Sequence, residues 1–345
     1  RAGNLPLHWA AEGKTAAAGV QALLDAEGKT KKPCIKERDA FQNLPLHRAA
    51  EKGAPADVIE VLIAAEPKAA SEKNTRELLP LALAIEADAP EASIVAILNA
   101  NPKAAAIKEP HEDRLPLHYA CEREASDGVI SALLIANFEA SKERTTKGYL
   151  PLHLAAQTWA SEFVMHSLLM AYPEAAREKA TDGSLPLHMA CTFTGYENVA
   201  YALLQMYPDG AKTRDATGQL PLHWAVSQKA SSGCVNDLLD AYAEGCQVAD
   251  NSGNLPVHSA LLAGASETTV SQLLGAFPGA TKQANHFNKA PLILATEAGL
   301  DHEMLKVILE AERRADSIFG SGAKVVAKKK GLGFTFPMKL GLWGS

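Results

Sequence analysis

An all-α solenoid of stacked helix-turn-helix units with hairpin loops is the fold class that the sequence predicts. Two observations predict it. A motif of the form x-P-L-H-x-A returns along almost the whole 345-residue chain, and an aliphatic pair follows each motif proline at a constant distance. A fixed period of roughly 20 to 50 residues indicates units that bury an apolar face only by stacking on their neighbours. The composition, 47% apolar and 21% charged, suits such a folded chain.

The motif prolines define nine units. They are spaced by 35 residues, except for one spacing of 39 and one of 36. The aliphatic pair begins 17 residues after each proline, as Leu203-Leu204 does after Pro186. Since that offset never varies, the extra residues of the first unit belong to a loop after its pair. The prolines are Pro6, Pro45, Pro80, Pro116, Pro151, Pro186, Pro221, Pro256 and Pro291, and the predicted array covers residues 1–316.

Each unit is expected to hold two helices, as residues 186–220 illustrate. Proline suits the first turn of a helix, where its missing N–H would have no partner, so a short helix begins at Pro186 and is interrupted near Gly195. Apolar residues at helical spacing then predict a second helix from about 197 to 207. This helix must stop at Pro208, because proline cannot continue a helix interior.

A polar link that closes on a tight turn is expected to complete each unit. Glycine stands three residues before the motif proline in five units, and it often follows an aspartate or a similar residue. That pattern is typical of a hairpin turn that needs a positive φ. The glycines are Gly3, Gly148, Gly183, Gly218 and Gly253.

The motif, the paired helices and the Gly-containing hairpin together resemble the ankyrin repeat, whose usual motif is T-P-L-H-x-A over about 33 residues. The resemblance implies a concave surface of hairpin tips and first helices that binds other proteins. It extends over residues 1–316, with two departures. Units here are about 35 residues long, and leucine replaces the threonine whose hydroxyl in the family caps the helix and meets the histidine. The replacing residues are Leu5, Leu44, Leu79, Leu115, Leu150, Leu185, Leu220 and Leu255, with Ala290 in the last unit.

A histidine returns at the fourth position of the motif in seven units. A catalytic site needs different groups that converge on one point, and one histidine per unit does not converge. Rings about 10 Å apart are also too distant to share a metal ion. We therefore expect neutral imidazoles that bridge the backbone of neighbouring hairpins. They are His8, His47, His118, His153, His188, His223 and His258, whereas Ala82 and Ile293 take their place in two units.

Partner contacts are expected at positions that vary between units on the hairpin tips. Aromatic and arginine side chains dominate interface energetics, although such tips can also be plain polar turns. The candidates are Phe41, Arg76, Arg114, Lys147, Tyr149, Gln219 and Phe287. Three residues after the proline, large side chains are expected to pack between helices. These are Trp9, Tyr119, Met189 and Trp224.

The C-terminal segment, residues 317–345, breaks the period and is predicted to be an extended tail rich in glycine. It carries five lysines and no acid, whereas the preceding residues hold 29 basic and 40 acidic side chains. Three roles stay open: docking in a groove of a partner protein, folding back on the acidic solenoid, and contact with nucleic acid or an anionic membrane surface. Its candidate contact residues are Lys328, Lys329, Lys330, Phe334, Phe336 and Trp343.

The function predicted from the sequence is a non-enzymatic protein-protein interaction module or scaffold. No nucleotide, hydrolase or metal motif occurs, so no cofactor and no small-molecule substrate are expected. The alternative is a structural subunit permanently integrated in a large multiprotein complex and anchored by its tail. Five scattered cysteines favour a reducing, intracellular compartment. The cytoplasm is the expected location, although a targeting segment before Arg1 would change it.

Overall fold

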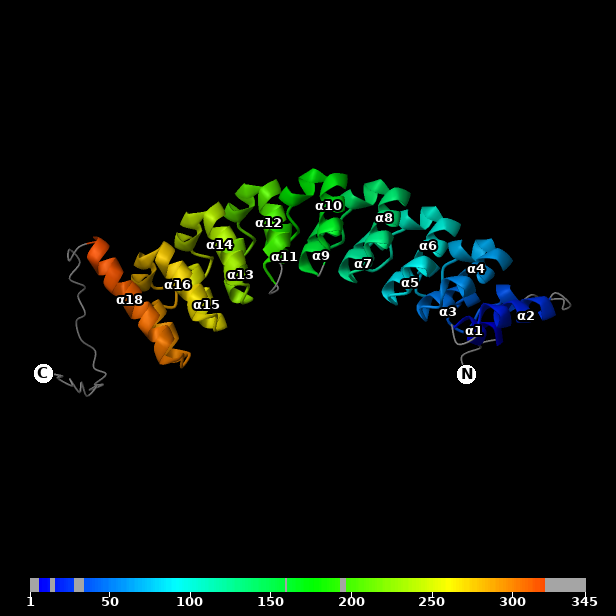
Figure 1. Ribbon diagram of the computed structural model, residues 1–345, viewed down its shortest axis with the longest axis horizontal. Coiled ribbons are helices and arrows are strands. Elements are labelled where there is room, and N and C mark those ends of the chain that lie inside the picture. The colour runs from blue at the N-terminus through cyan, green and yellow to red at the C-terminus, as the bar shows by residue number, and fades with distance from the viewer. Residues whose placement is uncertain (1–5, 13–15, 28–33, 159, 193–196, 320–345) are drawn as a thin grey trace, which may run out of the picture.

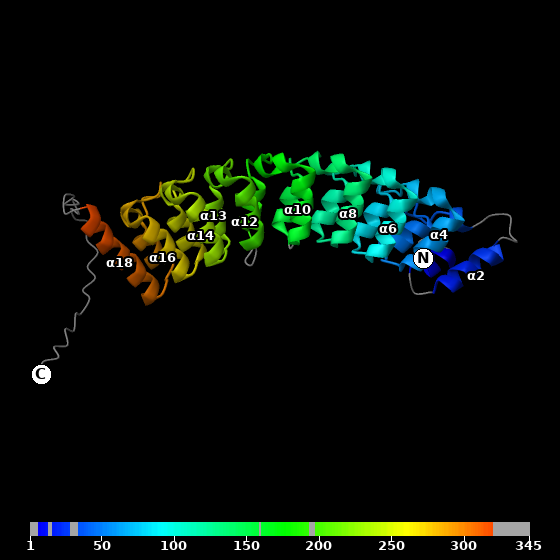
Figure 2. The same cartoon turned by 45° about the horizontal axis from the view of Figure 1, so that its top comes forward.

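The fold is given by a computed structural model, which describes residues 6–12, 16–27, 34–158, 160–192 and 197–319. In these residues every regular element is a helix, and the helices stack in two layers that form a curved arch (Figure 1). The first helix of each unit lies in the inner, concave layer, and the second lies in the outer layer. Figure 2 shows the same two layers with the arch turned by 45° about the horizontal axis, so that its top comes forward. The predicted all-α solenoid is therefore confirmed.

The inner helices begin at the motif prolines, as expected for a residue that fits the first helical turn. Each is short, about two helical turns, and the backbone then turns toward the outer helix. Their bounds are α1 Pro6–Ala11, α3 Pro45–Glu51, α5 Pro80–Glu86, α7 Pro116–Glu122, α9 Pro151–Gln157, α11 Pro186–Ala190, α13 Pro221–Ser227, α15 Pro256–Ala263 and α17 Pro291–Glu297.

The outer helices are longer and carry the aliphatic pair on their buried face. In four of them a serine before the first turn caps the helix, because its hydroxyl accepts a backbone N–H, as Ser161 does from Val164. Their bounds are α2 Ala17–Glu27, α4 Ala56–Ala65, α6 Glu91–Ala100, α8 Asp127–Ala136, α10 Glu162–Ala171, α12 Glu197–Met206, α14 Ser232–Ala241, α16 Glu267–Ala276 and α18 His302–Phe319. None of the described helices is long and apolar enough to cross a membrane.

The link after the outer helix is not merely polar, and in this respect the prediction was wrong. A 3₁₀ helix follows most outer helices and buries two small side chains, such as Ala175 and Ala176. In five of these units the proline that ends the outer helix also starts the 3₁₀ helix, so one residue serves both elements. The 3₁₀ helices are η1 Cys34–Lys36, η2 Pro67–Ser71, η3 Pro102–Ala106, η4 Phe138–Lys142, η5 Pro173–Arg177, η6 Pro208–Lys212, η7 Ala243–Gln247 and η8 Pro278–Lys282.

The leucine that precedes seven of the motif prolines contributes to one continuous core. Its side chain cannot cap the helix, and Leu150 and Leu185 are instead fully buried. Burying a leucine stabilises a fold by about 1.5 to 3 kcal/mol, which is at least what a capping hydroxyl contributes. The replacement of threonine by leucine therefore exchanges a polar cap for apolar packing.

The hairpin turns that the structure describes all use a left-handed residue three positions before the motif proline. In four of them this residue is glycine, with φ between +76° and +79°. Four units place another residue at the same position, with φ between +54° and +59°: Gln42, Glu77, Asp113 and Asn288. The conformation therefore belongs to the turn, and glycine is the residue that adopts it without strain.

Neighbouring hairpin tips are joined by backbone hydrogen bonds. The N–H of Thr181 donates to the carbonyl of Lys147 at 3.0 Å, and one unit further on Ala216 donates to Asp182 at 2.8 Å. The same bond joins Thr75 to Phe41, Thr146 to Glu112, Asn251 to Thr217 and His286 to Ser252. Between the third and fourth units the equivalent donor position is Pro110, which has no N–H to give. These bonds make the tips a single edge with fixed spacing.

Replacing Gly183 by alanine is expected to destabilise the array by about 1 to 3 kcal/mol, because the new methyl group would lie 2.8 Å from the backbone nitrogen of Ala216. Replacing Gly275 of α16 by alanine is expected to stabilise the array by about 0.5 to 1 kcal/mol, because nothing lies within 4 Å of the added methyl group. Urea denaturation followed by circular dichroism measures both. Equal effects of the two substitutions would contradict the steric explanation.

Candidate functional site

The motif histidines join successive units through the backbone. In His47 the Nδ1 atom accepts the N–H of Leu44 at 3.1 Å, and Nε2 lies 2.9 Å from the carbonyl oxygen of Glu72 in the next unit. Since Nδ1 accepts a hydrogen bond, it carries no proton itself. The ring is therefore neutral, with its proton on Nε2, and Nε2 donates to that carbonyl. One ring thus fixes both the start of its own helix and the position of the following hairpin.

The carbonyl that accepts the hydrogen bond from Nε2 lies on the first arm of the next hairpin in some units and on the second arm in others. His47, His118 and His258 donate to the first arm, at Glu72, Glu143 and Gln283. Three rings donate to the second arm: His8 to Asn43, His188 to Gln219 and His223 to Asn254.

His153 differs from the other motif histidines. Its Nδ1 atom accepts the N–H of Leu150 in the usual way, but its Nε2 has no hydrogen-bond partner among the described residues. The ring of Tyr149 lies against it, with 5.9 Å between ring centroids.

Burial keeps these rings neutral. It lowers the pKa of His47, His118, His153 and His188 from 6.5 to about 4, and it also lowers the pKa of His223 and His258. The hydrogen bond from Nε2 to a carbonyl acts in the opposite direction where it forms, but desolvation is the larger effect. No group of three or more His, Cys, Asp or Glu side chains in the described part of the chain is placed to hold a metal ion. The geometry makes these histidines structural links.

Side chains of the turn hold the hairpin tips in place. The Oδ1 atom of Asp39 accepts the N–H groups of Phe41 and Asn43, each at 2.8 Å. The same carboxylate or amide turn recurs at Asn74, Asp215, Asp250 and Asn285. With the backbone fixed in this way, the variable tip side chains project from a rigid edge. Phe41 is 53% exposed and Phe287 is 70% exposed.

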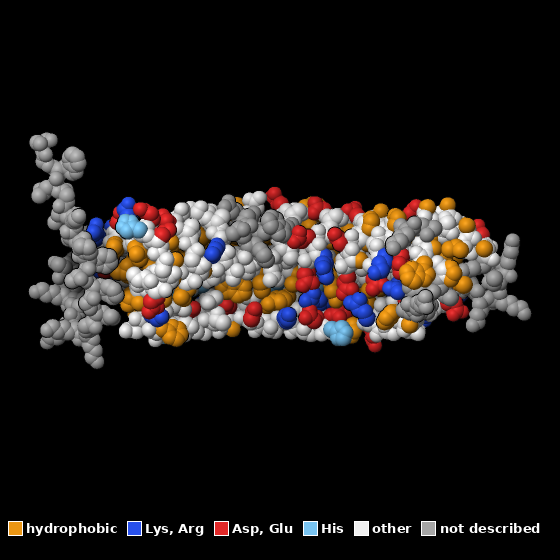
Figure 3. Space-filling model, turned by 90° about the horizontal axis from the view of Figure 1, so that it is seen from below, with side chains coloured by type: hydrophobic (Ala, Val, Ile, Leu, Met, Phe, Trp, Pro, Cys, Tyr) orange, Lys and Arg blue, Asp and Glu red, His pale blue; other side chains and the backbone are white. Residues whose placement is uncertain are grey.

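A network of opposite charges occupies the tips and inner helices of the third to fifth units. Arg114 forms ion pairs with Glu112 and Glu122, and its guanidinium lies 5.6 Å from the ring centroid of Tyr119. Lys147, one unit further along, lies 3.7 Å from the carboxylate of Glu112. Figure 3 shows these basic and acidic side chains gathered over the half of the concave face nearer the N-terminal units.

A small hollow lies within this network, between the third and fourth units. Its volume is about 250 Å³, and Arg76, Glu86, Arg114 and Tyr119 are among the side chains that line it. Arg76 pairs with Glu86 across it at 3.1 Å. The hollow is therefore lined by groups of both charges and by one aromatic ring.

The structure brings together some of the predicted contact residues and separates others. Arg76, Arg114 and Lys147 share the charged network, whereas Phe41 and Phe287 lie near opposite ends of the concave face. Tyr149 is partly buried, with its hydroxyl 3.4 Å from Asp182. The backbone carbonyl of Gln219 accepts the hydrogen bond from Nε2 of His188. The tail candidates lie outside the described residues: Lys328, Lys329, Lys330, Phe334, Phe336 and Trp343.

Sequence reasoning missed Glu86 and Glu122, two acids of this network. The signal was present, because Glu86 and Glu122 each stand six residues after a motif proline. It also misplaced Trp9, which is 55% exposed and not packed between helices, whereas Met189 is buried as expected.

Comparison with known protein families gives an independent result. A family model for ankyrin repeats in three copies matches residues 117–214 and 152–245. The chain therefore contains ankyrin repeats over these residues. The matched region extends from α7 into η7, and the same helix pair and hairpin recur on both sides of it. None of the curated proteins compared with the chain matches it. Ankyrin repeats generally mediate protein-protein interactions and are typically non-enzymatic modules.

The stability of this ankyrin array is expected to fall as the pH drops from about 6.5 to about 4. Between these values the unfolded chain binds protons at the motif histidines and the folded chain does not, because the folded-state pKa is lowered. Each such histidine removes about 1.4 kcal/mol per pH unit from the free energy of unfolding in this window, and its contribution is complete above it. Urea denaturation at a series of pH values measures the slope.

The variant His118→Gln tests the assignment of this slope. Glutamine does not titrate, so the difference in proton uptake on unfolding is expected to shrink by about one proton at pH 5. A variant with unchanged pH dependence would show that other groups cause the acid sensitivity.

Proposed function

We propose that the chain is a non-enzymatic scaffold that binds a protein partner through the hairpin tips and inner helices of its second to fifth units. The observation that carries the proposal is the set of tip side chains held on a rigid edge. Phe41 is 53% exposed, and the side chains of Arg76 and Lys147 are 56% and 60% exposed. Aromatic and arginine anchors on a fixed backbone lose little entropy when they bind.

The chemistry of this surface favours a partner with charges of both signs. Arg76 and Lys147 pair with acids of the same chain at 3.1 and 3.7 Å, and these exposed pairs are worth at most about 1 kcal/mol each. They exchange easily for charges of a partner. The ion pairs therefore hold these exposed side chains in place, and charges of a partner can still replace the internal ones.

Nothing in the described surface favours catalysis. The buried histidines and thiols are the groups with the strongest perturbations, and burial holds both in their neutral forms; it raises the pKa of Cys246 to about 11. A buried neutral group without access to solvent neither attacks a substrate nor exchanges a proton with one.

The double variant Arg76→Glu, Lys147→Glu is expected to weaken partner binding at least tenfold, because it reverses two exposed charges on the proposed face. The full chain serves as bait in cell extract, and recovered proteins are quantified by mass spectrometry. A recovered protein is then titrated against purified variants at two ionic strengths. The weakening should be smaller at the higher ionic strength.

Lys103→Glu is the matched control, since Lys103 is exposed on η3, away from the hairpin tips. It is expected to change the dissociation constant less than twofold. Equal losses with the control and the double variant, or no loss with either, would refute binding through the hairpin tips.

A further inference from the structure

An apolar groove on the convex face, on the side opposite the charged tips, is used by nothing described above. It lies between α10 and α12 and has a volume of about 530 Å³. Met165 and Leu169 form its floor and are 2% and 7% exposed. Met170 and Met206 stand at its rim, 67% and 45% exposed. Methionine is flexible and polarizable, which suits a surface that receives another apolar side chain.

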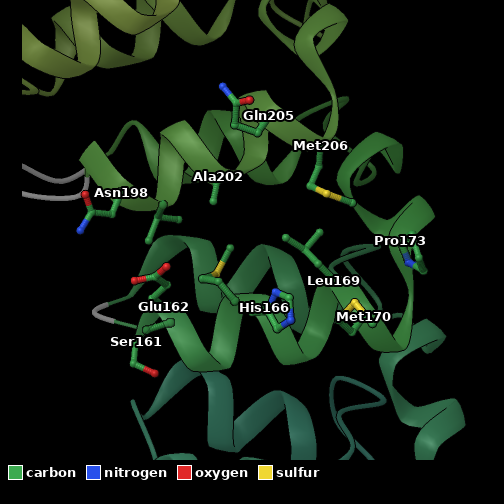
Figure 4. A pocket seen from close by; sticks show the side chains of 13 residues that line it. Ser161, Glu162, His166, Leu169, Met170, Pro173, Asn198, Ala202, Gln205 and Met206 are labelled. Atoms are coloured by element: carbon green, nitrogen blue, oxygen red, sulfur yellow. The ribbon is translucent and has the colours of Figure 1, made fainter.

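The two ends of the groove differ in chemistry. Figure 4 shows Ser161, Glu162 and Asn198 at one end, and Met170, Met206 and Pro173 at the other. The first end lies at the start of α10 and is polar with one acid. The second end lies where the outer helices finish and the 3₁₀ helix η5 begins, and it is apolar.

The apolar rim is a local departure from the repeat. Met170 stands 19 residues after its motif proline, and the equivalent residues of other units are polar or small, as Asn99, Asp240 and Gly275 are. The preceding unit has Ile135 at this position, 87% exposed. Exposed apolar side chains therefore continue from the groove onto α8, which is the pattern of a docking surface.

We propose that the C-terminal segment around Phe334–Trp343 of the same chain docks in this groove. The segment supplies the matching chemistry: Phe334, Phe336 and Met338 for the methionine end, followed by Lys339 for the acid at the other end. Three aromatic residues among the last twelve of the chain would then have an apolar surface to contact. This role is independent of the concave face.

The exit point of the tail lies on the correct edge of the array. The last turns of α18 pack against η8, and Lys282 of η8 forms an ion pair with Asp316. The last described residues of the chain, at the end of α18, therefore lie at the edge where the 3₁₀ helices lie. The methionine end of the groove opens at η5, on that same edge.

The length of the connecting chain is sufficient. The groove lies between α10 and α12, four and three units before α18, which corresponds to about 30 to 40 Å at roughly 10 Å per packed helix. The 14 residues from 320 to 333 reach up to about 46 Å when extended. A link with this much slack keeps the docking segment at a local concentration of the order of millimolar.

The spacing within the segment also fits the groove. Glu162 and Met170 are eight residues apart on α10, or about 12 Å along its axis. The three residues from Phe336 to Lys339 extend about 10 Å. With Phe336 between Met170 and Met206, Lys339 therefore reaches the carboxylate of Glu162.

Photo-crosslinking in the full chain tests this placement. A benzophenone amino acid replaces Phe336, and the crosslinked peptides are identified by mass spectrometry. Intrachain crosslinks to the peptides that hold Met170 and Met206 are expected, with a yield that does not depend on protein concentration. Met170→Arg places a charge in the groove and is expected to lower that yield at least fivefold.

Gly275→Arg is the matched control, because it adds the same charge at the equivalent position of α16, where nothing lies within 4 Å. It should leave the yield unchanged. A charge exchange adds a second readout: Glu162→Lys should lower the yield, and Lys339→Glu in the same chain should restore it.

Three outcomes would overturn the proposal. Crosslinks to the groove found only in covalent dimers would assign it to the tail of a second copy. Crosslinks elsewhere, or none, would leave the groove to another partner. Equal loss with Met170→Arg and Gly275→Arg would show a general effect of charge and no docking in the groove.

Discussion

The array depends on a constraint that no single unit can satisfy alone. Two short helices bury one apolar face only against a neighbour, and the hairpin that joins one unit to the next exposes backbone groups that must also find partners. The motif histidine meets both needs, because one ring accepts the N–H at the start of its own helix and, in six of the seven units that carry it, donates to the hairpin of the next. Burial that excludes water from these bonds also keeps the ring neutral, so packing and protonation state are coupled.

The hairpins add a second line of connection along the array. A left-handed residue turns the chain, a carboxylate or amide holds the turn, and one backbone bond joins each tip to the next. The interruption at Pro110 shows that the array tolerates the loss of one such bond, since the helices on either side continue to pack. The backbone of the tips therefore has the same conformation in each unit, whereas the tip side chains differ between units and can contact a partner.

The two faces of the arch are specialised differently. On the concave face charged side chains pair with one another across unit boundaries and leave polar groups exposed. On the convex face, the residue 19 positions after the motif proline is polar or small in most units. It is apolar on α8 and α10, and a groove opens between α10 and α12. A regular repeat would give every unit the same outer surface, so this local change of chemistry is what distinguishes the middle of the array.

The sequence by itself determined the period and the helix starts, because these depend on local rules that nine copies repeat. Proline at a first turn has the same meaning in every unit, and glycine three residues before it has the same meaning in each unit that carries it. Only the tertiary structure decided which side chains meet across units. The pairing of Lys147 with Glu112, the exposure of Trp9 and the 3₁₀ helix after most outer helices follow from how one unit sits on the next. The groove beside Met170 arises in the same way, since its walls come from two helices whose separation is set by packing and not by the pattern within either one.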